Sequence, residues 1–330
     1  MLSSVFDLQA NGIVIGVHEW MPDTGAPVGV VQVVHGMAEH GGRYAALAET
    51  LTAAGWVVVA ADLRGHGRTA QVPAAAGSAV GADPLGNLGH FADKLGWRSV
   101  VDDLRAVNLH IASRHPDVPV VMLGHSMGSL LARDFAASYP QALDGLVLTG
   151  TRRPAGLIGT AGKALATAIV RSRGPRHRSQ LLHQLNFGTA NAAFKPTRTE
   201  YDWLSRDAAE VDAYIADPLC GFTCTAQFYV DIIGGLARVN SRKQMKKTPK
   251  SLPVLVLSGS ADPIGGDRAA TAVKALLRSL GNKRVQVVNY RGARHELFHE
   301  TNRVEVVGDL VRWLDDLGAP DRDKGRGRGK

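Results

Sequence analysis

The most informative stretch of this sequence is Val118-Pro-Val-Val-Met-Leu-Gly-His-Ser-Met-Gly-Ser-Leu-Leu-Ala-Arg-Asp-Phe135. An apolar, β-branched run leads into Gly124-His125-Ser126-Met127-Gly128, and a helical pattern follows at once. This order predicts a strand, a sharp turn and a helix. Such a turn needs glycine two residues before and after the serine, because a side chain there would collide where strand and helix leave the turn. Ser126 is therefore expected at the carboxyl edge of a sheet, exposed as a nucleophile.

A serine hydroxyl needs a base to take its proton and an acid to orient that base. In chains with a serine on such a turn, the acid and then the base follow it, each on a loop after a later strand. Two later strands are predicted, at 252–258 and 285–290, and Asp262 follows the first while His295 follows the second. We therefore predict Ser126, Asp262 and His295 as the catalytic residues.

Other residues compete for these roles. Asp267 also follows the first of the two strands, but its position favours capping or charging the next helix. His299 lies four residues after His295 and is expected on the surface, in the opening turn of the last helix. His177 and His183 follow the serine but precede both strands, so chain order disfavours them.

An acyl-transfer site also needs two N–H donors for the oxyanion. The residue after the nucleophile supplies one, here Met127, and a loop after an early strand supplies the other. A valine-rich strand runs into His35-Gly36-Met37, so the Met37 N–H is the second expected donor. Gly36 and His125 adjoin these donors and are expected to contact substrate. His35 precedes the serine, so we interpret it as a buried histidine that fixes the loop.

Composition is that of an ordinary globular protein, with 45% hydrophobic and 21% charged residues among 330. The N-terminus lacks a signal-peptide pattern, and no run approaches the roughly 20 apolar residues of a membrane-spanning helix. A cytoplasmic location is expected, with peripheral membrane contact as an alternative. Cys220 and Cys224 have no Cys or His at metal-binding spacing, so we predict neither a disulfide framework nor a metal site, and no cofactor.

The formal net charge of +8 is concentrated in two segments. Residues 238–250 contain six lysines or arginines and no acid, and residues 319–330 form a basic, glycine-rich tail. A third group of cations precedes them: Arg171, Arg173, Arg176 and Arg178. If the four arginines and the 238–250 segment share a face beside the substrate entrance, that face would rest on anionic membrane, although a solvated surface is the interpretation we favour. Nucleic-acid binding is the weaker alternative, and no nucleic-acid partner is expected.

Strands and helices alternate on both sides of a long interruption. We predict a core formed by residues 1–150 and 251–318, a helical cap at 151–250 inserted between core strands, and a flexible basic tail at 319–330. The later part of the insertion is rich in aromatic residues, some of which are expected to roof the serine and line an apolar substrate channel.

Several motifs resemble those of the α/β-hydrolases, and within them the monoacylglycerol lipase and bacterial lysophospholipase group. They are His35-Gly36-Met37-Ala38-Glu39-His40 with Arg43-Tyr44, Asp62-Leu63-Arg64-Gly65-His66-Gly67, Gly124-His125-Ser126-Met127-Gly128, Asp262 and His295. In the insertion, segments 202–207 and 217–222 also resemble bacterial members of the group. The resemblance implies a mostly parallel central sheet flanked by helices. Thr69 departs from it, since serine commonly follows the Gly-His-Gly loop.

The leading hypothesis is a serine carboxylic-ester hydrolase that acts on a lipid-like ester, a monoacylglycerol or a lysophospholipid. The predicted residues do not choose the acyl donor or acceptor, so a thioester, amide or aryl ester substrate, or acyl transfer to another acceptor, remains an alternative. A non-catalytic ligand-binding protein of the same fold is a third hypothesis.

Overall fold

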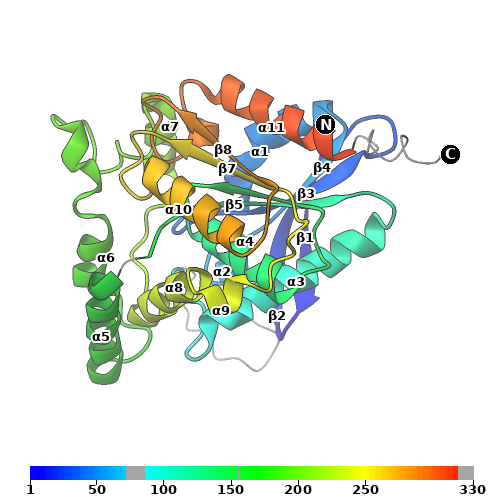
Figure 1. Ribbon diagram of the computed structural model, residues 1–330. Coiled ribbons are helices and arrows are strands. Elements are labelled where there is room, and N and C mark those ends of the chain that lie inside the picture. The colour runs from blue at the N-terminus through cyan, green and yellow to red at the C-terminus, as the bar shows by residue number, and fades with distance from the viewer. Residues whose placement is uncertain (72–85, 155, 319–330) are drawn as a thin grey trace.

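A single twisted sheet lies at the centre of the computed structural model, which describes residues 1–71, 86–154 and 156–318 (Figure 1). Within these residues the strand order is β1-β2-β4-β3-β5-β6-β7-β8. β2 pairs antiparallel with β1 and with β4, and all other neighbours are parallel. The strands are β1 (Leu2–Ala10), β2 (Ile13–Met21), β3 (Gly29–Val34), β4 (Trp56–Ala61), β5 (Val120–His125), β6 (Gly145–Thr149), β7 (Val254–Gly259) and β8 (Val285–Tyr290).

Helices connect the strands. They are α1 (Ala45–Ala53), α2 (Gly67–Gln71), α3 (Gly96–Arg114), α4 (Met127–Ser138), α5 (Gly156–Arg173), α6 (Gln180–Phe187), α7 (Ala208–Ala216), α8 (Ala226–Val239), α9 (Arg242–Met245), α10 (Gly266–Ser279) and α11 (Arg303–Gly318). The described residues also contain the short 3-10 helices η1 (Gly41–Tyr44), η2 (Ala190–Phe194) and η3 (Leu297–His299). No helix in this described part of the chain is long and apolar enough to cross a membrane.

Helices cover both faces of the parallel strands. On one face, α1 and α11 bury Leu51 and Leu310 against valines of β3 and β4. On the other, α3, α4 and α10 bury Leu104, Leu130 and Val273. Figure 1 shows these two layers on opposite sides of the sheet. Every residue of β3, β4, β5 and β7 is buried, which is why these strands are continuous apolar runs rather than alternating ones. The predicted fold class is confirmed.

The first strand was missed by the sequence interpretation. Residues of β1 are mostly exposed, so the segment lacks a strong apolar pattern. Its position is set by the hairpin to β2, whose turn is Asn11-Gly12 with φ of 51° and 74°. An Asn-Gly turn with two positive φ angles matches the twist of paired antiparallel strands, so the signal was present in the sequence.

The described residues of the long interruption between β6 and β7 form helices joined by turns and loops, with one isolated bridge between Arg178 and Thr225 and no strand. Figure 1 shows α5, α6 and α7 beyond the sheet, on the side toward which β7 and β8 run. By contrast, α8 packs against α3 and α4 of the core as well as against α5. The division into a core and a cap at 151–250 stays a prediction, and the predicted tail at 319–330 lies outside the described residues.

Candidate active site

The turn around Ser126 joins a central strand to a helix. β5 ends one residue before Ser126 and α4 begins one residue after it. Ser126 has φ 52° and ψ −116°, a conformation that costs a non-glycine residue about 1–3 kcal/mol. The packing around the turn requires its glycines: a Cβ on Gly128 would lie 1.9 Å from the carbonyl oxygen of Val34, and one on Gly124 would lie 2.4 Å from that of Gly128.

The three residues predicted to be catalytic lie together in one hydrogen-bonded chain. Nε2 of His295 is 2.9 Å from Oγ of Ser126, and Nδ1 of His295 is 2.9 Å from Oδ1 of Asp262. Asp262 also accepts a hydrogen bond from the Ile264 N–H at 2.8 Å. Although burial raises the pKa of Asp262, His295 and the backbone donors hold it below its ordinary value. The carboxylate is therefore ionised and oriented toward the imidazole.

Three of the competing residues are placed elsewhere. Asp267 lies in the first turn of α10, as expected. His177 lies between α5 and α6. His183 lines the same pocket as Ser126, but it lies on α6, across that pocket, and His295 holds the position beside the serine hydroxyl.

His299 is not in the last helix, so that expectation was wrong. It lies in η3, and α11 begins four residues later because Glu300 is extended, with φ −83° and ψ 161°. The Glu300 carboxylate accepts hydrogen bonds from Arg206, which holds this break in place. Nε2 of His299 lies 3.1 Å from the carbonyl oxygen of Arg43 rather than beside Ser126.

The loop after β3 lies against the serine turn. A Cβ on Gly36 would lie 3.3 Å from the Cβ of Ser126 and 3.2 Å from the ring of His125. Gly36, Met37 and His125 line one pocket with Ser126. Met127 is buried and is the first residue of α4, where backbone N–H groups have no partner within the helix. The oxyanion-binding role of Met37 and Met127 stays a prediction.

The two histidines next to this site are buried and neutral. Nε2 of His35 accepts a hydrogen bond from the Leu63 N–H at 2.9 Å, so Nδ1 carries the proton and donates to the Gly36 carbonyl at 2.8 Å. His35 thus fixes the loop, as expected, and burial lowers its pKa. Nδ1 of His125 is 2.9 Å from Oγ1 of Thr149. Burial, together with the neighbouring His295, lowers the pKa of His125 to about 4.

A buried ionic network lies behind the site, and the sequence interpretation did not predict it. The Arg43 guanidinium donates to Glu39 at 2.8 Å and to both carboxylate oxygens of Glu296 at 2.7 and 2.8 Å. Glu39 also accepts from the Gly36 N–H and from the Tyr44 hydroxyl. Glu296 follows His295 directly, so the network joins the loop after β3 to the loop after β8.

Arg43 determines the charge state of this network. Burial raises the pKa of both carboxyls, but the guanidinium holds the pKa of Glu39 and that of Glu296 below their ordinary values. Both are therefore ionised, and the three side chains together carry one net negative charge. The side chains of Arg43, Glu39 and Glu296 are only 9%, 3% and 5% exposed, so water screens them little.

The pocket over Ser126 has a volume of about 270 Å³ and an aromatic wall. That wall is contributed by the insertion and consists of Phe187, Tyr201, Trp203 and Tyr214. The Trp203 ring lies 5.1 Å from that of His295 and is stacked on Phe187 at 5.5 Å. Some aromatic residues of the insertion thus line the pocket, as expected, whereas Phe228 and Tyr229 belong to the main core.

One segment of the insertion is bonded directly to the histidine loop. The Glu296 N–H donates to the carbonyl of Leu204 at 2.8 Å, and the His295 N–H points to that of Trp203 at 3.4 Å. Arg206 forms a 2.8 Å ion pair with the fully buried Glu300. Residues 203–206 therefore help to hold the loop that carries His295.

Both cysteines are buried and free. Burial raises the pKa of each thiol. Cys220 packs in a small cluster with Trp203 and Tyr214, whereas Cys224 belongs to the main core.

Comparison with known proteins identifies the family. A family model described as "Serine aminopeptidase, S33" matches residues 25–302. The chain belongs to this hydrolase family. The monoacylglycerol lipase of Mycolicibacterium smegmatis is 29% identical over 307 residues, which cover 92% of this chain and 94% of that relative. The monoglyceride lipase of Homo sapiens is 30% identical over 319 residues, which cover 93% and 88%.

Solved structures agree on the fold. A carboxyl esterase from Bacillus coagulans superposes with a TM-score of 0.86 at 26% identity, over 97% of this chain and 100% of the esterase. The monoglyceride lipase of Saccharomyces cerevisiae superposes with a TM-score of 0.74 at 19% identity, over 97% of each chain. The chain is therefore an α/β-hydrolase similar to monoacylglycerol lipases.

Proposed function

We propose that this α/β-hydrolase cleaves lipid-like carboxylic esters through an acyl-enzyme formed on Ser126. One observation carries the proposal: the Ser126 hydroxyl, the His295 imidazole and the Asp262 carboxylate form a continuous hydrogen-bonded chain at the base of an aromatic pocket. This arrangement suits a nucleophile, a base and a group that orients and stabilises the base.

The proposed reaction has two halves. Nε2 of His295 takes the Ser126 proton while Oγ attacks the acyl carbon, and the negative charge on the carbonyl oxygen is held by the Met37 and Met127 N–H groups. The ester C–O bond then breaks, and the alcohol leaves with the proton from His295. Water repeats the attack on the acyl-enzyme with His295 as base, which releases the acid and restores Ser126. No metal or cofactor takes part.

Monoacylglycerols are the substrate class that we propose first, and lysophospholipids the second. The names of the relatives favour a glycerol ester, and the aromatic wall suits an acyl chain. Aryl esters, thioesters and amides use the same chemistry, as does acyl transfer to an acceptor other than water. A non-catalytic binding protein is disfavoured by the intact hydrogen-bonded chain.

A fluorophosphonate probe tests the mechanism. It should label the wild type on Ser126 and leave Ser126→Ala unlabelled, and the variant should lose several orders of magnitude of ester hydrolysis while its unfolding curve is unchanged. Retention of more than about a tenth of the rate would refute the nucleophile. A panel of monoacylglycerols, lysophospholipids and aryl esters of graded chain length then ranks the substrates by kcat/KM.

We also propose peripheral contact with anionic membrane through α5 and the turn after it. Leu157 and Ile158 are 88% and 85% exposed at one end of α5, and Arg171 and Arg173 are exposed at the other. Each cation near an anionic surface contributes about 1 kcal/mol. Sedimentation with vesicles should show binding that requires anionic lipid and weakens with salt.

Variants locate this contact. Binding should fall when Arg171, Arg173, Arg176 and Arg178 all become glutamine, and it should not fall in the matched variant with Lys246→Gln and Lys247→Gln. Equal binding to neutral vesicles, or equal loss in both variants, contradicts the contact. A cytoplasmic location is part of this proposal, and fractionation of cells that express the chain tests it.

A further inference from the structure

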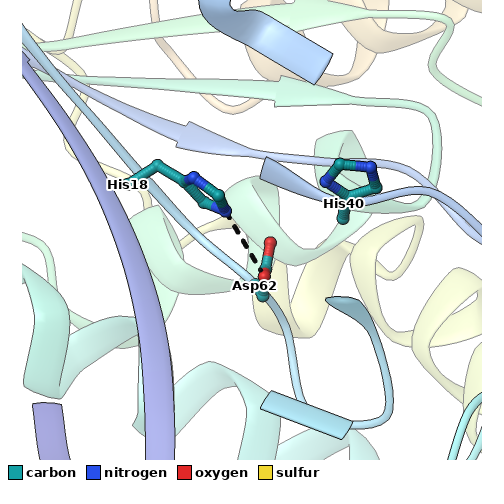
Figure 2. Close-up of side chains that lie close together, drawn as sticks. All are labelled: His18, His40 and Asp62. Atoms are coloured by element: carbon teal, nitrogen blue, oxygen red, sulfur yellow. Dashed lines mark ion pairs between the residues drawn. The ribbon is translucent and has the colours of Figure 1, made fainter. Parts of the chain in front are cut away.

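Three side chains outside the candidate active site converge from separate parts of the sequence. His18 lies on β2, His40 lies in the loop before η1, and Asp62 follows β4. Their ligand atoms all lie within 4.8 Å of one another, and Figure 2 shows the two imidazole rings on either side of the carboxylate. We propose that His18, His40 and Asp62 bind one divalent transition-metal ion of the zinc type.

The spacing of one pair of donor atoms, those of His18 and Asp62, fits such an ion. Nε2 of His18 is 3.4 Å from Oδ2 of Asp62, which is long for a hydrogen bond, and this buried nitrogen has no hydrogen-bond partner. Two ligands about 2.0–2.1 Å from a tetrahedral zinc ion lie about 3.3–3.4 Å apart. The two atoms therefore already have the separation that coordination requires.

The hydrogen bonds of His40 select the coordinating nitrogen. Nε2 of His40 is 2.8 Å from Oδ2 of Asp217, and the Gly42 N–H donates to Nδ1 at 3.2 Å. The proton is therefore on Nε2, and the lone pair is on Nδ1. Figure 2 shows one ring nitrogen of His40 facing His18 and Asp62 and the other directed away. Coordination through Nδ1 replaces the long Gly42 bond and keeps Asp217 as the carboxylate partner that orients the ring, a common arrangement at zinc sites.

Charge and access favour a dication. Asp62 and Asp217 supply two negative charges, and two arginines near them in sequence are already paired: Arg68 with Asp7 and Arg43 with two glutamates. The side chains of His18 and His40 are 18% and 15% exposed, so the two rings border solvent, whereas Nε2 of His18 and the Asp62 carboxylate are buried. Two imidazoles and one carboxylate with open positions suit zinc and similar ions.

A second three-residue group shares His40 and serves as the rival hypothesis. His40, Asp217 and Cys220 also lie within 4.8 Å of one another. Coordination there would remove the proton from Nε2, break the 2.8 Å bond to Asp217 and reverse the tautomer that Gly42 supports. The first group requires neither change, which is why we place the ion between His18, His40 and Asp62.

Titration of the full chain with Zn²⁺ and Co²⁺, after treatment with chelator, tests the proposal. One ion should bind per chain and raise the melting temperature in a concentration-dependent way. Asp217 only orients His40, so Asp217→Asn should weaken metal affinity by roughly 10- to 100-fold. His18→Ala and His40→Ala each remove a direct ligand and should weaken metal affinity by more than that. His177→Gln, a histidine outside the cluster, should bind like the wild type.

Spectra of the Co²⁺ form separate the two groups. The proposed site predicts tetrahedral or five-coordinate visible bands with no thiolate charge-transfer band, unchanged in Cys220→Ser. A thiolate band that disappears in Cys220→Ser would overturn the assignment in favour of the rival group. The site itself would be overturned if His18→Ala bound the metal as tightly as the wild type, provided that the metal-free variant and the metal-free wild type have the same unfolding curve. Ester hydrolysis should persist in chelator, because the ion is not part of the proposed chemistry.

Discussion

Replacing Arg43 by methionine should leave two buried carboxylates without a counter-charge. Arg43 makes three hydrogen bonds of 2.7 to 2.8 Å to Glu39 and Glu296. Breaking a buried ion pair by removing one partner costs about 3–5 kcal/mol. We therefore expect Arg43→Met to lower the free energy of unfolding by about that amount, which for a chain of 330 residues corresponds to a fall of roughly 4–7 °C in Tm.

The pH dependence of this loss identifies its cause. In the wild type, the folded-state pKa values of both carboxyls are depressed, so their contribution is present above the ordinary carboxyl pKa and is lost as the pH falls below it. Arg43→Met removes the strongest interaction that lowers those pKa values, so burial, which raises them, becomes the dominant effect. The variant should therefore become more stable as the pH falls from 7 to 5, whereas the wild type should not.

Thermal and urea unfolding at pH 7 and pH 5 measure both effects. Adding Glu296→Gln to Arg43→Met should recover part of the loss at pH 7, because one of the two unpaired charges is removed. The control is Arg68→Met, which breaks the exposed pair with Asp7 and should cost at most about 1 kcal/mol. An equal loss at both pH values, without recovery in the double variant, would show that lost packing rather than unpaired charge is responsible.

Three further predictions concern the active-site turn, the acid and a carboxyl on α8. Gly128→Ala should destabilise the chain by about 3 kcal/mol or more, because the added Cβ would overlap the Val34 carbonyl. The control is Gly162→Ala on α5, where the atom nearest to the added Cβ is 3.7 Å away, and this variant should be more stable by up to about 1 kcal/mol. Urea unfolding of both variants measures the two changes. Asp262→Asn should reduce kcat strongly and Asp267→Asn should not, because only Asp262 bonds His295; equal kcat values for the two variants would refute the assignment. Burial raises the pKa of Asp231 to about 6, so ionisation of this carboxyl lowers the stability of the fold as the pH rises from about 4 through 6. Asp231→Asn should therefore raise Tm at pH 8 and leave Tm unchanged at pH 4. An equal rise in Tm at both pH values would exclude ionisation as the cause.

The sequence predicted the inner strands β3 to β7 because these strands are buried on both faces. A continuous apolar run such as Trp56–Ala61, which directly follows Gly55, has few other interpretations. Chain order and strand ends were then enough to select Asp262 and His295, since parallel strands bring their carboxyl ends to one edge. The edge strand β1 was missed, because its residues are mostly exposed and its position depends on pairing with β2.

Interactions between distant residues were not predictable in the same way. Arg43 and Glu296 are 253 residues apart, and nothing in either local sequence indicates that they form a buried pair. The cluster of His18, His40 and Asp62 has no metal-binding spacing either, because each residue comes from a different element. Its proximity follows from the antiparallel pairing of β2 with β4, in which His18 lies opposite Ala60.

The hydrogen bonds between residues 203–206 and the loop that carries His295 limit how this chain can be recombined with its relatives. A chimera that exchanges the whole interval from β6 to β7 would replace the backbone carbonyls that receive the His295 and Glu296 N–H groups, together with the Arg206 partner of Glu300. Exchange confined to α5, α6 and η2 would alter the Phe187 side of the pocket and leave those partners in place. Grafts intended to transfer acyl-chain preference should therefore begin after β6 and end before Thr199.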